Sequence, residues 1–425
     1  MSDRWATGDA SGLSFPAEPD AFHDVDVTFL TKAFHSSGVL ADDNAITRID
    51  RCEEVTGGST GRKVLLDVGY RRPQTDLHTG LFVKFSRDFD DPLRDRGRTQ
   101  MESEVKFASL SLAPEFPIAV PRTHFADYHR DSGTGILISQ RISFGINGIE
   151  RQYHKCLDYE MPRPVDHYRA LLTAVARLGG THRSGGFSAD VTDQFPVDLR
   201  AAAVGEPPAL TREKLARRLA RLSEFVRSHA GLMPENVRSP DFLARLDDDA
   251  HRVFEREPAI WRYLAEARDY IALSHWNANV DNAWFWADAD DVVRCGLMDW
   301  GCVSQLNVAM AIWGALSGAE TALWDNHFDD LLALFCAEMH ASGGPRLDAA
   351  ELKRQVTLYT VLMGVTWLMD VPALVRARVP DSGAATRRTD PAIRGDEGVR
   401  APLQMLTNVL NIWASTDLAG ALQRL

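Results

Sequence analysis

The sequence predicts an α+β fold, with a small antiparallel sheet in its N-terminal part and a large, mainly helical C-terminal part. Between residues 48 and 85, short runs with alternating apolar residues are separated by glycine-rich and polar turns, which is typical of antiparallel strands. From about Asp166 onward, apolar residues recur every three or four positions, as they do on helices. The chain has 425 residues, more than one hydrophobic core of ordinary size holds, so we expect two lobes.

The N-terminal part begins with a segment of low apolar content. Residues 1–25 are rich in Gly, Ser, Pro and Asp and lack the basic start and apolar core of a signal peptide, so we expect a flexible leader there. Residues 26–145 would then form the N-terminal lobe, which consists of the sheet and one short amphipathic helix after residue 100.

Residues 146–425 form the predicted helical lobe. It contains a polar loop and hairpin at residues 274–301 and, at residues 376–400, a segment rich in Arg, Asp, Pro and Gly without apolar periodicity, which we expect to be a flexible loop. The most apolar run, residues 356–369, is shorter than the roughly 20 residues that cross a bilayer. It predicts a buried helix, opened by a capping box of Asp348 and Glu351, so we expect no membrane partner.

Composition excludes several classes of protein. Hydrophobic residues make up 45% and charged residues 25% of the chain, which is ordinary globular usage. The net charge of −12 argues against a broad surface for nucleic acid. The five cysteines are scattered and show no Cys-x-x-Cys spacing, so they predict reduced thiols rather than a zinc or redox site. We therefore expect a cytoplasmic protein without a nucleic-acid partner.

A glycine-rich turn lies between two of the predicted strands. It contains Gly57, Gly58, Ser59 and Gly61. Glycines allow backbone N–H groups to approach phosphate oxygens closely, although glycines in hairpin turns are common without any such role.

The strand that follows the next loop carries a lysine on its outer face. Its apolar residues at 81, 83 and 85 share one face by the two-residue repeat, which leaves Lys84 on the other. Lys84 would neutralise phosphates if a carboxylate from the following helix held its ammonium in place. Glu104 is the preferred partner and Glu102 the rival, while an ordinary surface pair is the alternative to both.

A second set of polar residues lies in the helical part. His275, Asn277, Asp281 and Asn282 belong to one loop, and Asp299 follows a predicted hairpin. An amide oxygen and a carboxylate are suitable ligands for a divalent ion that bridges nucleotide phosphates. The hairpin would place Asn282 and Asp299 at the same end, so we predict these two residues as the metal ligands.

These motifs resemble those of the aminoglycoside phosphotransferase and choline kinase-like superfamily, which has a bilobed protein-kinase-like fold. The family reads His-Gly-Asp-x-x-x-x-Asn and Ile-Asp-Trp where this chain has HWNANVDN at residues 275–282 and MDWG at 298–301. With Lys84 and Glu104, the likeness covers about residues 48–316. It implies ATP or GTP and Mg²⁺ as cofactors and a small hydroxylated molecule as the acceptor.

The chain departs from the family pattern at its catalytic position. Asn277 stands where the family has an aspartate, and an amide cannot accept a proton at neutral pH, so it would orient a hydroxyl without acting as a base. Asp281 would take over as the base or add a metal ligand, or it is an ordinary loop aspartate that caps a turn. His275 is expected to brace the loop. Asn307 is a second departure, since the family usually has an aspartate there.

Two functions follow from this pattern. One is a phosphotransferase that moves the terminal phosphate of ATP or GTP to a small-molecule hydroxyl. The other is a nucleotide-binding pseudokinase with a regulatory or scaffolding role, which would engage a partner protein. The sequence favours the first through the retained lysine and metal pair, and the second through Asn277.

Overall fold

The computed structural model describes residues 4–57, 60–187, 190–201, 209–384 and 387–425. The chain divides into two compact units, each described here by itself. The first unit contains residues 1–147 together with the short segment 296–303. The second contains residues 148–295 and 304–425. The assignment of residues 296–303 to the first unit matters for the site, because this segment carries Asp299.

The first unit is built on a five-stranded antiparallel sheet with the strand order β3-β4-β5-β7-β6. Its strands are β3 (Ile46–Val55), β4 (Lys63–Tyr70), β5 (Gly80–Phe85), β6 (Thr123–His129) and β7 (Thr134–Gln140). Its other elements are β1 (Trp5–Thr7), β2 (Ser14–Pro16), α1 (Pro19–Phe22), α2 (Val27–Ser36), α3 (Pro92–Asp95) and α4 (Gln100–Leu110).

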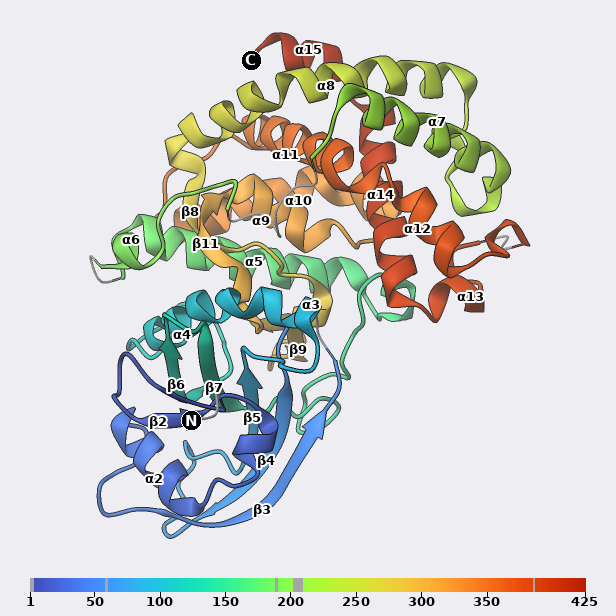
Figure 1. Cartoon of the computed structure of the whole chain (residues 1–425). Coiled ribbons are helices and arrows are strands. Elements are labelled where there is room, and N and C mark those ends of the chain that lie inside the picture. The colour runs from blue at the N-terminus through green and yellow to red at the C-terminus, as the bar shows by residue number, and fades with distance from the viewer. Residues whose placement is uncertain (1–3, 58–59, 188–189, 202–208, 385–386) are drawn as a thin grey trace. The chain divides into compact units, whose positions relative to one another are not determined.

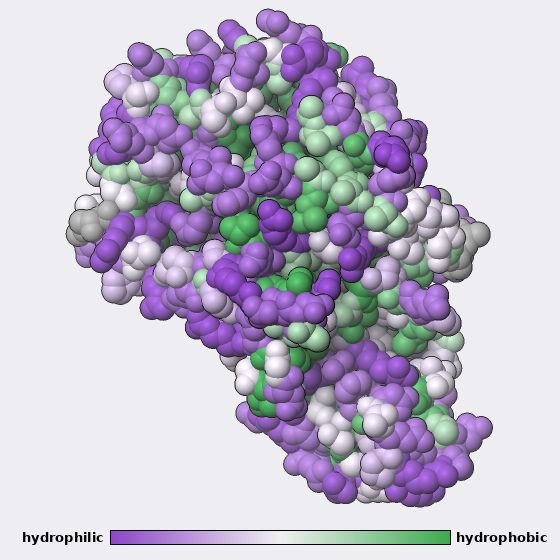
Figure 2. All heavy atoms as spheres, turned by 180° about the vertical axis from the view of Figure 1, so that it is seen from behind, coloured by the Kyte–Doolittle hydropathy of each residue, from purple (hydrophilic) through white to green (hydrophobic). Residues whose placement is uncertain are grey.

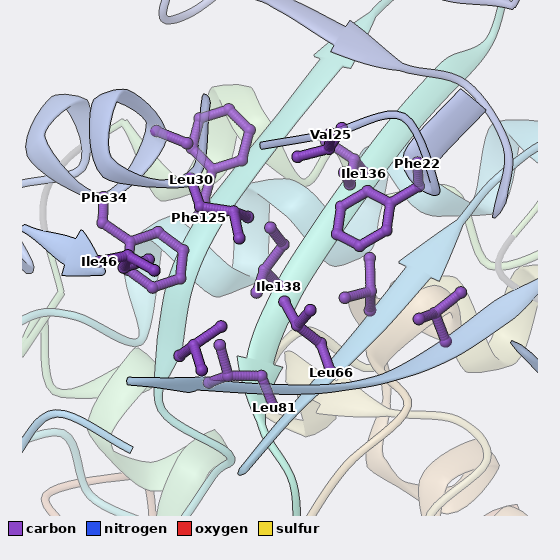
Figure 3. Close-up of a cluster of buried hydrophobic side chains, with 14 of the residues drawn as sticks. Phe22, Val25, Leu30, Phe34, Ile46, Leu66, Leu81, Phe125, Ile136 and Ile138 are labelled. Carbon is purple, nitrogen blue, oxygen red and sulfur yellow. The ribbon is translucent and has the colours of Figure 1, made fainter. Parts of the chain in front are cut away.

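The two faces of this sheet have different covers. Leu81, Val83 and Phe85 alternate along β5 and are buried against apolar residues of α1 and α2, which include Phe22 and Leu30 (Figure 3). The opposite face is covered by α4, whose apolar residues pack against β6 and β7. The expected alternation is thus confirmed, and it places Lys84 on the α4 side of the sheet.

The flexible leader expected at residues 1–25 is wrong for the described part of that segment. β1 and β2 form a small antiparallel pair, and Phe15 is fully buried. The carboxylate of Asp127 on β6 accepts hydrogen bonds from the backbone N–H groups of Ala10 and Ser11. Single apolar anchors and one distant carboxylate hold this segment, and neither produces a periodic pattern in the sequence.

The second unit is mainly helical. Its helices are α5 (Pro164–Arg183), α6 (Val191–Gln194), α7 (Arg212–Ser228), α8 (Pro240–Glu266), α9 (Val308–Leu316), α10 (Thr321–Ala341), α11 (Ala349–Met363), α12 (Val371–Arg378), α13 (Pro391–Arg394), α14 (Glu397–Ser415) and α15 (Leu418–Gln423). Two small two-stranded sheets complete it, with β8 (Ile271–His275) beside β11 (Val303–Asn307) and β9 (Ala283–Ala287) beside β10 (Val293–Leu297). Figure 1 shows these elements, and the predicted fold class is confirmed.

The predicted buried helix at residues 356–369 is confirmed as the end of α11 and the π-helical turn Gly364–Leu368 that follows it. Asp348 caps α11, because its carboxylate accepts from the N–H of Ala350 at 2.8 Å. Among the described residues, no single helix is long and apolar enough to cross a membrane, and only the bent pair Ala349–Leu368 with Val371–Arg378 meets those criteria together.

The flexible loop expected at residues 376–400 is only partly a loop. Within its described part lie the end of α12, a 3-10 turn at Ser382–Ala384, α13 and the start of α14. Ion pairs support these short elements, including Arg378 with Asp396 at 2.8 Å and Arg388 with Glu320 at 3.0 Å. Charged contacts of this kind leave no apolar periodicity, so the sequence did not reveal them.

Hydrophilic side chains are prominent over the face seen in Figure 2, with hydrophobic ones showing between them.

Candidate active site

Lys84 is the centre of a charged cluster in the first unit. Its ammonium donates hydrogen bonds to both carboxylate oxygens of Glu104, each at 2.8 Å. The side chains are 12% and 6% exposed, so this ion pair is largely withdrawn from water. Glu102, the rival partner, instead pairs with Lys106 at 2.9 Å and with Arg130 at 3.1 Å. Of the two alternatives, Glu104 is the residue that holds Lys84.

Asp299 shares the same lysine. Its Oδ1 lies 2.6 Å from Lys84 Nζ, and its side chain is 51% exposed. The backbone at Asp299 is left-handed, with φ of 66°, which turns the chain sharply before Trp300. The Trp300 ring stacks on Phe107 of α4 at a centroid distance of 3.7 Å, and the backbone N–H of Trp300 donates to Glu104 Oε1 at 3.3 Å. The turn that carries Asp299 is therefore fastened to the helix that carries Glu104.

The electrostatics of this cluster follow from burial and opposite charge. Burial by itself lowers the pKa of the Lys84 ammonium, but the carboxylates of Asp299 and Glu104 outweigh it and raise the pKa overall. Burial raises the pKa of Glu104, against the opposing effect of Lys84. Lys84 is consequently a permanent cation at neutral pH, as a phosphate-binding group must be.

Gly58 and Ser59 of the predicted glycine-rich turn lie outside the described residues, whereas Gly57 and Gly61 are described. Gly61 has a left-handed backbone, with φ of 53°, and a Cβ at this position would overlap the carbonyl oxygen of Phe85. Only glycine fits there. The position brings the turn directly against the end of β5, the strand that carries Lys84.

Two basic residues near this turn escaped the sequence reasoning. The Lys63 ammonium donates to the carbonyl oxygens of Gly57 and Thr60, both at 2.8 Å. Arg94 donates to the carbonyl oxygens of Gly57, at 3.4 Å, and Gly61. For Lys63 the sequence did offer one signal, because this residue begins the strand that precedes the strand of Lys84. Arg94 lies in a segment without strand or strong helix pattern, and no signal indicated it.

In the second unit, the predicted catalytic-like loop follows β8. His275 at the end of β8 is fully buried, and its Nδ1 accepts from the backbone N–H of Asn277 at 3.1 Å. The Asn277 side-chain oxygen accepts from Asn279 Nδ2 at 2.6 Å. Its backbone oxygen accepts from Asn282 Nδ2 at 2.9 Å. Three amides and one imidazole thus contribute hydrogen bonds that hold this part of the loop.

Asn282 and Asp299 have the chemistry that a magnesium ion requires. Asn282 uses its amide nitrogen within the loop, and within the described residues its carboxamide oxygen takes no hydrogen bond. Asp299 supplies a half-exposed carboxylate. Oxygen ligands of these two kinds suit Mg²⁺, which takes few protein groups and completes its shell with phosphates and water. The two residues belong to different units, so their joint action stays a prediction.

No larger metal cluster competes with this pair: the described part of the chain contains no group of three or more His, Cys, Asp or Glu arranged to hold a metal ion.

Asp281 differs from the other polar residues of the loop because it carries a charge. Its Oδ2 lies 3.5 Å from Lys155 Nζ. Its Oδ1 is buried and has no hydrogen-bond partner in the described part of the chain. Burial raises the pKa of the Asp281 carboxyl, partly offset by Lys155. Oδ1 therefore caps no turn among the described residues.

Helix α9 packs against the loop that follows β8. Asn307 caps this helix, since its side-chain oxygen accepts from Ala309 N at 2.9 Å. Its amide nitrogen donates to Leu264 O at 3.0 Å and to Gln355 Oε1 at 2.7 Å. An aspartate could not make these two donations, so the contacts seen here require the amide of asparagine. Gly314 lets the helix approach the loop, because a Cβ there would overlap the carbonyl oxygen of Trp276.

The order of elements in the first unit is that of the nucleotide-binding lobe in kinase-like folds. A strand, a glycine-containing turn, a second strand, a strand with a lysine, and a helix with the paired glutamate follow one another. The second unit adds the helical part and the loop after β8. The fold thus joins a strand lysine and a helix glutamate in one buried ion pair.

Solved structures that match the chain include kinases and phosphotransferases of small molecules. They include a Plasmodium vivax ethanolamine kinase (TM-score 0.41, 11% identity, 85% of this chain and 82% of that one). A microcompartment-associated aminopropanol kinase has a TM-score of 0.40 and 13% identity, over 89% and 95% of the two chains. The GDP complex of an aminoglycoside 2'-phosphotransferase-IIIa has a TM-score of 0.41 and 16% identity, over 85% and 94%.

No protein-family model matches the sequence, and no curated protein does. At these TM-scores and identities the structural likenesses carry no argument about reaction or substrate, which has to come from the residues of this chain.

Proposed function

We propose that this protein is a phosphotransferase that transfers the terminal phosphate of ATP or GTP to a hydroxyl of a small molecule. The observation that supports this most strongly is the Lys84 ammonium, held by Glu104 at 2.8 Å and by Asp299 at 2.6 Å on the outer face of the sheet. A withdrawn lysine with a fixed carboxylate partner is suited to neutralising phosphates. An ordinary surface ion pair would be mostly exposed, which this one is not.

The donor side of the reaction follows from these residues. Lys84 neutralises the phosphates, Glu104 keeps its ammonium in position, and the backbone around Gly57 and Gly61 approaches the phosphate oxygens. Asn282 and Asp299 would hold Mg²⁺, which supplies charge neutralisation on the phosphates when it is bound. In the absence of nucleotide, Lys84 serves as the counter-ion of Asp299.

The acceptor side uses the loop after β8. The carboxamide of Asn277 would orient the acceptor hydroxyl by a hydrogen bond, while the carboxylate of Asp281 would accept its proton. Phosphoryl transfer depends mainly on positioning and electrostatic stabilisation, and a general base typically contributes about 10²–10⁴-fold. A loop without the usual aspartate is therefore compatible with slow transfer.

One observation favours a second candidate function. The Asn277 side-chain oxygen, the atom that would accept a hydrogen bond from a hydroxyl, is already occupied by Asn279 at 2.6 Å. This arrangement suits a nucleotide-binding pseudokinase that has kept the donor side and acts by engaging a partner protein.

Nucleotide binding is the first test, and thermal unfolding measures it. Mg-ATP or Mg-GTP at 100 times its dissociation constant should stabilise the wild-type protein by about 2.7 kcal/mol. Asp299→Ala should abolish this shift. Asp329→Ala is the matched control, since Asp329 also pairs with a lysine, Lys353, but is exposed on α10. If neither nucleotide stabilises the wild-type protein, both candidate functions are wrong.

Release of ADP or GDP separates the two functions. Incubation with a library of hydroxylated small molecules should give nucleoside diphosphate and a phosphorylated acceptor if the protein is a transferase. Binding without any turnover across the library would favour the pseudokinase.

A further inference from the structure

Lys63 and Lys84 lie directly opposite each other on neighbouring antiparallel strands, β4 and β5. Side chains of directly opposed residues point to the same face of a sheet, and like charges in that relation are destabilising. The first unit therefore brings two lysines together on the face that carries the candidate phosphate site. Such an arrangement requires compensation by anions, either from the protein or from a ligand.

The protein compensates only one of the two lysines. Lys84 contacts two carboxylates, those of Glu104 and Asp299. Lys63 forms no salt bridge in the described residues, and its ammonium donates only to the carbonyl oxygens of Gly57 and Thr60. An ammonium has three N–H donors, so one of them remains after these two contacts.

The neighbouring residue shows that unpaired charge is particular to this face. Arg62 precedes Lys63 and points to the opposite face, where it pairs with Glu54 at 2.7 Å and Glu18 at 3.3 Å. Arg94 of α3, which donates to carbonyl oxygens of the same glycine-rich turn, has one carboxylate contact among the described residues, Asp88 at 3.4 Å. Arg62 thus has carboxylate partners, whereas Lys63, on the other face, has none among the described residues.

We propose that Lys63 is a second phosphate-binding lysine of this site, anchored on the carbonyl oxygens of Gly57 and Thr60 and able to donate its third N–H to a bound polyphosphate. The inference rests on the proposed nucleotide-binding function and adds a residue to it. It assigns the charge of Lys63, which no carboxylate among the described residues pairs with, to recognition of a polyanion, and it makes Lys63 distinct from a lysine that only supports the turn.

The ionisation of Lys63 distinguishes recognition of phosphate from a role that only supports the glycine-rich turn. Burial, together with the charges of Lys84 and Arg94, lowers the pKa of Lys63 to about 8, while Asp299 and Glu104 act in the opposite direction. As pH rises through this value Lys63 loses its charge, yet a neutral amine keeps two N–H groups for its two carbonyl partners. A supporting role would survive this deprotonation, whereas attraction of phosphate would weaken.

The test compares Lys63→Gln and Lys63→Arg with the wild-type protein by titration calorimetry, using ATP, GTP and inorganic tripolyphosphate. Lys63→Gln should weaken binding of the preferred nucleotide and of tripolyphosphate by roughly tenfold, the value of one charge-assisted hydrogen bond. Lys63→Arg should stay within about threefold of wild type. Lys106→Gln is the control, because Lys106 is a paired lysine of the same unit.

A pH series completes the experiment. Between pH 7 and pH 9, wild-type affinity should fall while that of Lys63→Arg stays level, since arginine remains charged. Any change in the nucleotide's own ionisation is common to both proteins. Equal affinity of Lys63→Gln and wild type, or parallel pH profiles of wild type and Lys63→Arg, would overturn the inference alone. If wild type binds no nucleotide, the proposed function fails instead. Should Lys63→Gln not fold, the pH comparison with Lys63→Arg decides.

Discussion

The candidate site residues of the two units are held in place by different forces. In the first unit, Lys84, Glu104 and Asp299 are joined by ion pairs of 2.6–2.8 Å. In the second, Asn277 and Asn282 are joined by hydrogen bonds between neutral amides and backbone. The proposed nucleotide-binding residues are charged, whereas Asn277 and Asn282 on the proposed acceptor side are neutral. This difference is why nucleotide binding is the better supported half of the proposed function.

The buried carboxylates Glu104 and Asp158, one in each unit, differ in whether a cation lies beside them. The buried carboxylate of Glu104 has a lysine against it. Asp158 in the second unit is 1% exposed, yet no salt bridge reaches it in the described residues, and one of its oxygens has no hydrogen-bond partner there. Removing a charge should therefore have opposite consequences in the two units.

Lys84→Met should have the largest effect. It leaves the buried Glu104 carboxylate and Asp299 without their cation, which should cost about 4 kcal/mol of unfolding free energy and abolish nucleotide binding. The double variant Lys84→Met/Glu104→Gln should recover much of the stability but none of the binding. Urea unfolding and nucleotide titration measure the two effects. A Lys84→Met protein as stable as wild type would show that the pair is not buried in solution.

Asp158→Asn should act in the other direction. Burial raises the pKa of Asp158 to about 7, despite a hydrogen bond from Tyr168 at 2.6 Å. A carboxyl whose pKa is higher in the folded state than the usual 3.8 stabilises the protein below pH 4, and this contribution is lost as pH rises to 7. Asparagine is neutral and can still accept from Tyr168. At pH 8 the variant should be more stable than wild type by roughly 4 kcal/mol.

The pH series provides the check on this prediction. The advantage of Asp158→Asn should shrink from pH 8 to pH 4, as measured by urea unfolding at each pH. An advantage that stays constant with pH would mean that ionisation of Asp158 is not its cause. Asp329→Asn, on the exposed face of α10, should show no such change.

Sequence reasoning reached the parts of the fold and site that follow local patterns. Alternation along residues 81–85 placed Lys84 on the outer face, and the helix pattern selected Glu104 over Glu102. The buried helix after Asp348 followed from apolar content and a capping residue. The face of Lys84 and the buried helix depend on residues close together in the chain, where spacing determines which side chains share a face. The preference for Glu104 came from the resemblance of the residues around it to the family's helix pattern.

Contacts between distant segments were beyond that reasoning. The leader is fixed by Phe15 and by Asp127, and Lys63 became a candidate only when its register opposite Lys84 was known. The role of Asn307 depends on Leu264 and Gln355, which are far away in sequence. Such residues carry no periodic signal, because their partners are determined by tertiary structure.

Gly314→Ala tests whether packing, rather than charge, positions the loop of the second unit. The added methyl group would overlap the carbonyl oxygen of Trp276, which a rigid backbone cannot easily relieve. We expect a loss of about 3 kcal/mol, together with reduced turnover. Gly179→Ala is the matched control within a helix, because the nearest atom to its added Cβ is a methyl carbon of Ala272 at 3.3 Å. It should change stability by less than about 1 kcal/mol. Equal losses in the two variants, measured by urea unfolding, would contradict the prediction.

Asn277→Asp tests whether turnover is limited by the absence of a carboxylate at position 277. The loop should keep its shape, since Asn279 Nδ2 can donate to a carboxylate as it does to the amide, and Asn282 contacts only the backbone oxygen of residue 277. If Asn277 only orients the hydroxyl, an aspartate should raise turnover about 10²-fold, or about 2.7 kcal/mol in activation free energy. Nucleotide affinity should not change, because the charged cluster of the first unit is intact.

The companion variant Asp281→Asn identifies the base in the wild-type protein. If Asp281 accepts the proton, its loss should lower wild-type turnover, and Asn277→Asp should restore it in the double variant. Turnover that is unaffected by Asp281→Asn and raised by Asn277→Asp would mean that the natural protein works without a base. If none of the three variants shows turnover while nucleotide binding is retained, the protein binds nucleotide without catalysing transfer. That result would favour the pseudokinase function.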